Sequence, residues 1–290
     1  CRIQELFMLK EIERTDSDRY KKQIEERIPT FAKEKIERTI SLLQEISLPS
    51  VLQLLQKGID HSVVENKNKT TLNSGFDGYD LQDRHTMLEY QHRMHNDISR
   101  FCAKEIYNGE ALHNGTIINR NWDYSRYNRR AIWLNVNSDR NCSNENAKEV
   151  EVIVKEIKAF VEYASKNPKK NGEKWSIACL TYYRKQEKLL KEKIKNIFND
   201  KRAKNYYVDE NKGIELMIYT VDKFQGKEAD VVFLSMIKCG AVPLGFMDSP
   251  NRLNVALTRA KYQMVIVGNK EYFNGNACKS RLLRKVAEEY

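Results

Sequence analysis

The chain has 290 residues, enough for one large domain or two modest ones. Hydrophobic residues make up 41% of it and charged residues 31%, a composition typical of a soluble globular protein. No run of about 18 or more apolar residues occurs, so we expect no transmembrane helix and no membrane partner.

The net charge of +10 is concentrated in one part of the chain. Residues 166–204 hold 13 basic and 4 acidic side chains, whereas the charges of residues 1–60 balance at 11 of each sign. A basic block of this kind indicates contact with a polyanion, most often nucleic acid. For Lys188 to Lys195 alone, a solvated helix face is the favoured explanation.

The N-terminus and the cysteines suggest where the chain comes from and in which compartment it works. The N-terminus has no signal-peptide pattern, and it starts at Cys1 rather than Met, so we expect a piece of a longer product. Six cysteines lie far apart with no CxxC pair. This spacing favours reduced thiols in a cytoplasmic protein over a disulfide framework.

The first part of the chain differs in pattern from the rest. Residues 1–58 interleave charges with Leu and Ile and are expected to be helical, and residues 59–83 form a polar, irregular segment. From residue 84 onward, apolar strand patterns alternate with helical ones. We therefore expect a helical segment and linker over 1–83 and one α/β domain over 84–290.

Short apolar runs in the second part predict buried strands at Ala131–Val136, Trp175–Thr181, Ile214–Tyr219, Asp230–Ile237 and Tyr262–Val267. Asn144 is expected to cap a long amphipathic helix, and a basic helix should run to about Phe198. Alternating strands and helices, with strands apolar on both sides, predict a parallel sheet in an α/β/α sandwich. Ligands of such sheets bind at the carboxyl ends of the strands.

A predicted helix before the last strand carries two arginines on one side. Its buried face would consist of Leu253, Ala256, Leu257 and Ala260. Arg252 and Arg259 lie on a second stripe, seven positions apart. This stripe is either a solvated face or a site for an anion.

The stretch "QHRMHN" (Gln91–Asn96) allows two interpretations. It can be a polar loop that presents Arg93 to an anion, or part of a metal site formed with nearby residues. The candidate ligands are His85, His92, His95 and Cys102. Their spacing fits no common zinc pattern, so we favour the loop and expect no metal.

Two further stretches place polar groups next to buried strands. "TYYRKQ" (Thr181–Gln186) ends a strand with hydroxyls, aromatic rings and the first turn of a helix, which suits phosphate binding. "TVDKFQGKEAD" (Thr220–Asp230) joins two strands, and Gly226 allows a tight loop within it. A structural turn would need fewer polar residues than this loop has.

Together with "RLNVALTRAK" (Arg252–Lys261), these stretches resemble the second motor domain of superfamily 1 nucleic-acid helicases, on the nonsense-mediated-decay and Dna-type branch. The family patterns are Q-Y-R-M-H-P, T-P-Y-x-x-Q, T-V-D-x-F-Q-G-x-E-x-D and R-L-N-V-A-L-T-R-A-K. The last two match almost letter for letter, and the resemblance covers about residues 84–270. It implies a RecA-like fold, with residues 1–83 belonging to or inserted in a first motor domain.

The resemblance implies a role for each matching residue. Arg259, as the arginine finger, and Arg93 would reach the γ-phosphate of ATP, bound with Mg²⁺ between two RecA-like domains. The nucleotide would also be held by Gln91, His92, Gly226 and Glu228. Single-stranded DNA or RNA would be contacted by Thr181, Tyr183 and Thr220. Apart from the resemblance, we expect Arg184 and Lys185 to join them, because both lie in the first turn of the helix that follows. Arg252 has no implied role; it either contacts the cleft or is solvated, and solvation is favoured.

The sequence departs from the family at a few positions. His92 stands where the family has a Tyr that stacks on the base, and Tyr182 and Asn96 replace prolines. No G-x-x-x-x-G-K-S/T motif occurs, so this chain should hold only half of an ATPase site. "YVDEN" (Tyr207–Asn211) has the wrong position for an acidic Mg²⁺ motif and is interpreted as a polar turn.

Two functional classes remain open. The chain can be part of an ATP-dependent helicase or translocase whose first RecA-like domain carries the phosphate-binding loop. It can instead be a non-enzymatic RecA-like module that binds nucleic acid or a protein. The intact Arg93, Glu228 and Arg259 favour the first class, because a binding module needs no arginine finger.

Overall fold

The computed structural model describes residues 51–58, 70–84, 86, 88–109, 112–115, 122–138 and 141–290. The chain forms two compact units that divide between residues 87 and 88, where the sequence predicted a boundary near residue 84. The helices expected over residues 1–58 lie outside the described residues, apart from α4 (Val51–Lys57).

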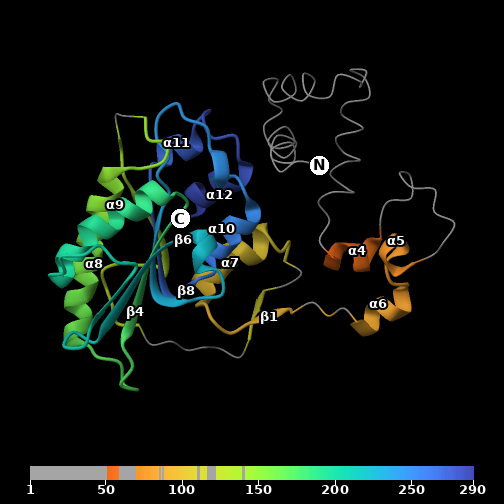
Figure 1. Cartoon of the computed structure of the whole chain (residues 1–290), viewed down its shortest axis with the longest axis horizontal. Coiled ribbons are helices and arrows are strands. Elements are labelled where there is room, and N and C mark those ends of the chain that lie inside the picture. The colour runs from red at the N-terminus through yellow and green to blue at the C-terminus, as the bar shows by residue number, and fades with distance from the viewer. Residues whose placement is uncertain are drawn as a thin grey trace. The chain divides into compact units, whose positions relative to one another are not determined.

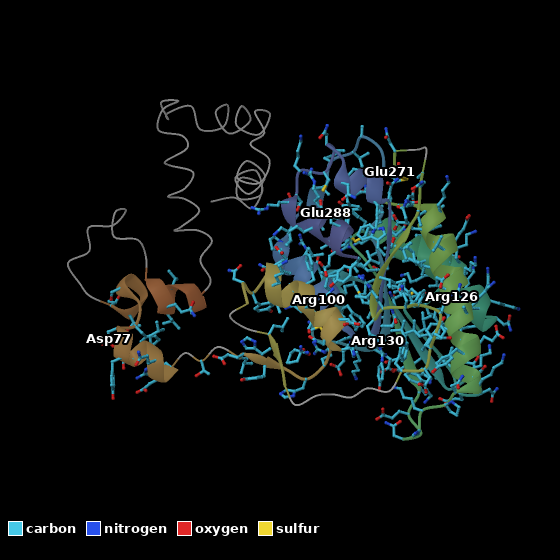
Figure 2. The ribbon with its side chains drawn as sticks, turned by 180° about the vertical axis from the view of Figure 1, so that it is seen from behind. Asp77, Arg100, Arg126, Arg130, Glu271 and Glu288 are labelled. Atoms are coloured by element: carbon cyan, nitrogen blue, oxygen red, sulfur yellow. A yellow bond between two sulfur atoms is a disulfide. The ribbon has the colours of Figure 1, made fainter. Side chains whose placement is uncertain are left out.

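The first unit contains short helices within the stretch that was expected to be irregular. They are α5 (Thr71–Ser74) and α6 (Gly78–Arg84). Asp77 precedes α6, where its carboxylate accepts a hydrogen bond of 2.8 Å from the backbone N–H of Asp80 (Figure 2). Such an acceptor satisfies one of the unpaired N–H groups at a helix start, so a polar stretch can still form a turn of helix.

The second unit is built on a six-stranded sheet with the order β3-β8-β7-β4-β6-β5 (Figure 1). The strands are β3 (Ala131–Asn135), β4 (Trp175–Thr181), β5 (Tyr206–Asp209), β6 (Ile214–Thr220), β7 (Ala229–Ser235) and β8 (Ala260–Gly268). Neighbouring strands are parallel except for β5, which pairs antiparallel with β6. Every residue of β4 and β7 is buried, so these strands lack the polar alternation of a half-exposed strand.

Helices cover both faces of this sheet (Figure 1). One face carries α8 (Ala147–Lys166) and α9 (Arg184–Ile194); the other carries α7 (Asn96–Glu105), α10 (Pro250–Leu257), α11 (Lys270–Asn274) and α12 (Arg281–Glu289). Phe160 and Leu190 belong to the first apolar layer, and Leu253 and Phe273 belong to the second. The predicted three-layer α/β fold of RecA-like type is therefore confirmed.

Smaller elements connect these layers. β1 (Tyr90–Gln91) and β2 (His113–Asn114) form a separate parallel pair. Three 3₁₀ turns are η1 (Lys195–Phe198), η2 (Val221–Phe224) and η3 (Gly245–Met247). Figure 2 labels Arg126 beside α8, where its guanidinium donates to Glu156 at 2.8 Å. None of the helices in the described ranges is long and apolar enough to cross a membrane.

Several predicted elements differ from the observed ones. α8 is capped by Asn146 rather than Asn144, because the Asn146 side chain accepts a hydrogen bond from the Glu149 N–H. "YVDEN" is not only a turn: Tyr207 is buried and pairs with Leu216, so the stretch begins as the edge strand β5. The sheet is accordingly mixed rather than wholly parallel.

Two of the six cysteines form a disulfide, so the expectation of reduced thiols was wrong for them. Cys142 and Cys239 are bonded across a Cα–Cα distance of 4.9 Å, and their backbones also form an antiparallel bridge. Cys102, Cys179 and Cys278 are free and buried. The bonded residues are 97 positions apart in the sequence, so only the fold brings them together.

Candidate functional site

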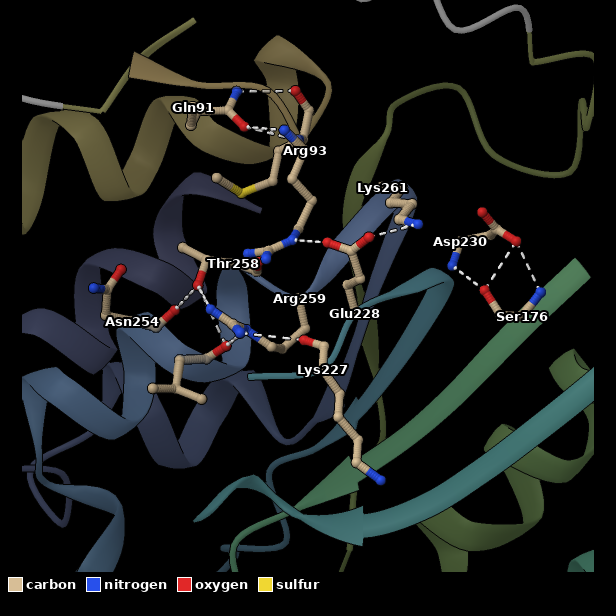
Figure 3. Close-up of polar contacts among 12 residues, drawn as sticks. Gln91, Arg93, Ser176, Lys227, Glu228, Asp230, Asn254, Thr258, Arg259 and Lys261 are labelled. Atoms are coloured by element: carbon tan, nitrogen blue, oxygen red, sulfur yellow. Dashed lines mark hydrogen bonds and ion pairs between the residues drawn. The ribbon is translucent and has the colours of Figure 1, made fainter. Parts of the chain in front are cut away.

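The two arginines of the predicted phosphate site meet at Thr258, between α10 and β8 (Figure 3). Arg93 follows β1, and its Nη1 donates to the Thr258 carbonyl at 3.1 Å. Arg259 directly precedes β8, and its Nη2 donates to the Thr258 hydroxyl at 2.8 Å. The fold thus joins two motifs that are far apart in the sequence.

Arg259 lies beyond α10 rather than on it. The helix ends at Leu257, and Ala260 already belongs to β8, so Arg252 and Arg259 do not share a helix face as predicted. Arg259 Nε donates to the Val255 carbonyl at 2.9 Å. The last carbonyls of a helix have no partner within it, so this guanidinium also caps α10.

Glu228 holds Arg93 in place. Its carboxylate accepts from Arg93 Nε and, at 2.6 Å, from Lys261 Nζ (Figure 3). Burial opposes the charge of Glu228, but hydrogen bonds from Lys261 and Arg93 outweigh it and lower its pKa to about 2. The carboxylate is therefore ionised at neutral pH, and it fixes two cations beside it.

The cluster carries more positive than negative charge. Arg93, Lys261 and Arg259 surround the single carboxylate of Glu228, which gives a local net charge of +2. Burial of Arg259, together with the positive charge of Arg93, lowers the Arg259 pKa. An anion bound here would relieve this repulsion, so the geometry suits a phosphate group.

This cluster lies at the amino edge of the sheet, not at the carboxyl edge where ligands were expected. Glu228 directly precedes β7, and Arg259 directly precedes β8. Because both strands run in the same direction, their first residues lie on one edge.

Gln91 shapes the loop that carries Arg93. Its Oε1 accepts from the backbone N–H groups of Arg93 and Met94 at 2.9 and 2.7 Å, and its Nε2 donates to the Met94 carbonyl and to Asn114. The amide of Gln91 is thus occupied by protein groups. His92 is exposed, and its ring lies against Gly115, where an added Cβ would come within 2.0 Å of it.

Gly226 forms the turn before Glu228. Its φ of +84° lies in the left-handed region, which glycine adopts without strain. An added Cβ would meet no atom within 4 Å, so the backbone conformation, and not crowding, requires glycine here. The turn positions the backbone of Lys227, and the Lys227 carbonyl accepts a hydrogen bond of 3.2 Å from Arg259 Nη1.

The residues expected to contact nucleic acid lie at the opposite, carboxyl edge. Thr181, Thr220 and Ser235 end β4, β6 and β7 and pair in register. A strand of this length separates the two edges by about 20 Å. Thr181 has no exposed surface and Thr220 is only 7% exposed, so neither lines an open groove in this structure, contrary to the expectation from the resemblance.

Tyr183, Arg184 and Lys185 follow Thr181 at the start of α9. Tyr183 is half-buried, and its hydroxyl donates to the Leu244 carbonyl at 2.8 Å. Arg184 and Lys185 are exposed in the first turn of the helix. These residues, rather than the buried threonines, present polar and aromatic groups at this edge.

Much of the basic block is neutralised by neighbouring carboxylates. Lysines in it pair with Glu162, Asp230, Glu210, Glu187, Glu192 and Asp200. The other basic residues of the block form no ion pair within the described part of the chain: Lys170, Arg184, Lys185, Lys188, Lys193, Lys201 and Arg202. The local excess of charge is thus smaller than the sequence suggests.

Arg252 is not simply solvated, as was favoured from the sequence. Its Nε donates to Asp222 in η2 at 2.8 Å, and its side chain is 37% exposed. Asp222 follows β6, so this ion pair links α10 to the loop between β6 and β7. Arg252 is thus partly exposed to solvent, as was favoured, and in addition forms an ion pair at the surface.

Sequence reasoning missed three residues at these two edges. Thr258 and Lys261 stand inside "RLNVALTRAK", so the motif contained the signal for them, but no role was assigned. Lys238 was not identified because it follows the strand Asp230–Ile237, and none of the four family motifs includes that position. No group of three or more His, Cys, Asp or Glu in the described ranges is placed to hold a metal ion; His85 lies outside them.

Comparisons with known proteins agree with these motifs. The family described as AAA domain matches residues 68–271. The chain is 28% identical over 247 residues to the DNA polymerase alpha-associated DNA helicase A of Saccharomyces cerevisiae, which covers 79% of this chain and 34% of that protein. It is 30% identical over 190 residues to the regulator of nonsense transcripts 1 of Caenorhabditis elegans, which covers 63% of this chain and 17% of that protein.

A solved structure of the C-terminal domain of a possible DNA helicase from Lactobacillus plantarum WCFS1 is also similar, with a TM-score of 0.38 and 14% identity. It covers 68% of this chain and 94% of that one. The chain spans about a third of the yeast helicase and less of the nematode regulator. The family match and the four motifs agree: this chain belongs to the AAA domain family and contains a helicase domain of superfamily 1.

Proposed function

We propose that this chain is the second motor domain of an ATP-dependent nucleic-acid helicase or translocase. The observation that carries the proposal is the meeting of Arg93 and Arg259 at Thr258, with a local net charge of +2 around Glu228. A first RecA-like domain, absent from this chain, would hold Mg²⁺ and the phosphates of ATP. Arg93 and Arg259 would then reach the γ-phosphate from the opposite side of the domain interface.

The arrangement suits charge stabilisation in phosphoryl transfer. Charge spreads over the oxygens of the transferred group, and a fixed guanidinium stabilises it without reorganisation. In this proposal, Glu228 contacts the ribose, and Gln91, His92 and Gly226 shape the loops around the nucleotide. Tyr183, Arg184 and Lys185 contact single-stranded DNA or RNA, with Thr181 and Thr220 in the layer beneath them.

The chain alone should not hydrolyse ATP at a helicase-like rate, because its sequence contains no G-x-x-x-x-G-K-S/T motif. ATP turnover of residues 1–290 should be indistinguishable from that of its Arg259→Ala variant, with and without single-stranded nucleic acid. Equal, low rates would point to a trace contaminant. Strong turnover that nucleic acid stimulates and Arg259→Ala abolishes would contradict the division of the site between two domains.

Weak, sequence-independent binding of single strands is expected from the chain itself. Release of about three to five counterions predicts that log affinity falls with log salt at a slope of roughly −2 to −3.5. Lys185→Ala should make the slope shallower by about 0.7, whereas Tyr183→Ala should lower affinity without changing the slope. Fluorescence anisotropy with labelled strands at several salt concentrations measures both quantities.

Lys193 provides the matched control for this titration. It is exposed on α9 and forms no ion pair among the described residues, as is true of Lys185. Lys193→Ala should leave affinity nearly unchanged. An equal loss for Lys193→Ala and Tyr183→Ala would mean that the block attracts nucleic acid diffusely and that the assigned strand contacts are wrong.

A further inference from the structure

Lys238 is a lysine in the interior of the protein next to the proposed nucleic-acid edge. It follows β7, and only 2% of its surface is exposed. Its ammonium lies 4.6 Å from the centre of the Tyr183 ring, a distance typical of a cation–π contact. Lysine is rarely buried without a specific purpose, because its charge must be taken out of water.

The backbone that carries Lys238 is strained. Ile237 has a φ of +68°, a left-handed value that is a genuine outlier for a β-branched residue. The Lys238 N–H donates to the Met236 carbonyl at 2.7 Å, which closes a three-residue turn around Ile237. Such a conformation persists only where surrounding contacts impose it, and it often accompanies function.

Contacts on both sides of Lys238 impose this turn. The Glu149 carboxylate accepts from the Ile237 N–H at 2.9 Å, and the Asn146 amide donates to the Ile237 carbonyl at 3.2 Å. On the other side, Cys239 is bonded to Cys142 and exchanges two backbone hydrogen bonds with it. The position of Lys238 is therefore determined from both directions.

The other contacts of Tyr183 are equally specific. Its hydroxyl donates to the Leu244 carbonyl at 2.8 Å. Gly245 has a φ of +60°, and a Cβ at this position would lie 2.9 Å from the Tyr183 hydroxyl. The loop after β7 thus fixes Tyr183 at two points, at the ring through Lys238 and at the hydroxyl through Leu244.

We infer that Lys238 is a positioning residue that holds the Tyr183 ring as a platform for stacking one base of a single strand. The inference rests on the proposed function, because it assumes that a strand passes Tyr183. Stacking on an aromatic ring favours binding of any base, and the gain is larger when the ring is already ordered. Lys238 acts through Tyr183 and does not release a counterion from the strand itself.

This role predicts a specific signature in a salt titration of the full chain with labelled oligothymidine and oligouridine. Lys238→Met should weaken binding about fivefold to tenfold and leave the slope against log salt unchanged, because no phosphate contact is lost. Lys238→Arg should bind nearly as tightly as the native protein, since arginine also packs on aromatic rings. A slope shallower by about 0.7 in Lys238→Met would instead indicate a direct phosphate contact and overturn the inference.

A second measurement tests the ring without nucleic acid. With fluorotyrosine at position 183, the ¹⁹F signal should shift and broaden in Lys238→Met and stay near its native position in Lys238→Arg. Gly245→Ala, which places a methyl group against the Tyr183 hydroxyl, should weaken strand binding in the same way, again at unchanged slope. Thermal unfolding identifies any variant that is not folded.

The two proposals fail in different ways. If the native chain and Tyr183→Ala bind strands equally poorly, the assignment of nucleic acid to this edge is wrong. If the native chain binds strands, but Lys238→Met is folded and leaves both the affinity and the ¹⁹F signal unchanged, the positioning role of Lys238 is wrong.

Discussion

In a protein that joins this chain to a first motor domain, as proposed above, Arg259→Ala is expected to lower ATP turnover about 10³-fold or more, as loss of an arginine finger does. The physical reason is that the guanidinium stabilises charge that develops only during phosphoryl transfer. Arg259→Lys should recover little, because an ammonium cannot reproduce the forked geometry of arginine. Steady-state ATP hydrolysis at saturating nucleic acid measures the effect.

The structure adds a stability component to this prediction. Arg259 caps the last turn of α10 through the Val255 carbonyl, so its removal should also lower the free energy of unfolding by about 1 kcal/mol. Arg281→Ala is the control, because Arg281 is exposed at the start of α12, away from Thr258. Unchanged turnover in a folded Arg259→Ala protein, or unfolding of that variant at ambient temperature, would contradict the assigned role.

Glu149→Ala is expected to have the largest effect on stability, lowering the free energy of unfolding by about 3 to 5 kcal/mol. Glu149 is fully buried, and its carboxylate accepts from the Ser235 hydroxyl at 2.6 Å and from the Ile237 N–H at 2.9 Å. Removing it leaves both donors unpaired in the interior. Denaturant unfolding of this variant and of Glu151→Ala, an exposed neighbour on α8, provides the comparison.

Glu149 also makes stability depend on pH. Burial raises its pKa to about 8, although the hydrogen bonds from Ser235 and the backbone oppose the shift. Since the unfolded value is about 4.5, the folded state holds this proton more tightly. The resulting stabilisation is complete below the unfolded pKa and is lost as pH rises through about 8.

Glu149→Gln isolates this contribution, because glutamine keeps the shape and carries no charge. The stability of the native chain relative to Glu149→Gln should fall between pH 5 and pH 8, roughly the interval between the two pKa values. Parallel stability profiles for the two proteins across this interval would show that Glu149 titrates alike in the folded and unfolded states.

The fold class and the family could be predicted from the sequence because their signals are local. The runs "WSIACLT" and "DVVFLS" are largely apolar on both sides of the strand, a pattern that is needed only where both faces of a strand are covered. Both runs lie in the centre of the sheet. The motif "RLNVALTRAK" is one continuous run of residues, so it can be recognised without knowledge of any tertiary contact. The arginines could therefore be named as a pair before their positions were known.

Only the tertiary structure decided how these residues are used. Arg259 caps α10 and Gln91 closes its own loop through contacts within four residues, which depend on the direction of each side chain. Thr181 is covered because strands from distant parts of the chain pair with it. The same holds for the Cys142–Cys239 disulfide, the Asp222–Arg252 pair and the position of Lys238 under Tyr183. Hydrophobic periodicity predicts which face of its own helix or strand a residue occupies. The residues that it contacts on other elements depend on the order of the strands in the sheet. The spacing of residues along the sequence does not encode that order.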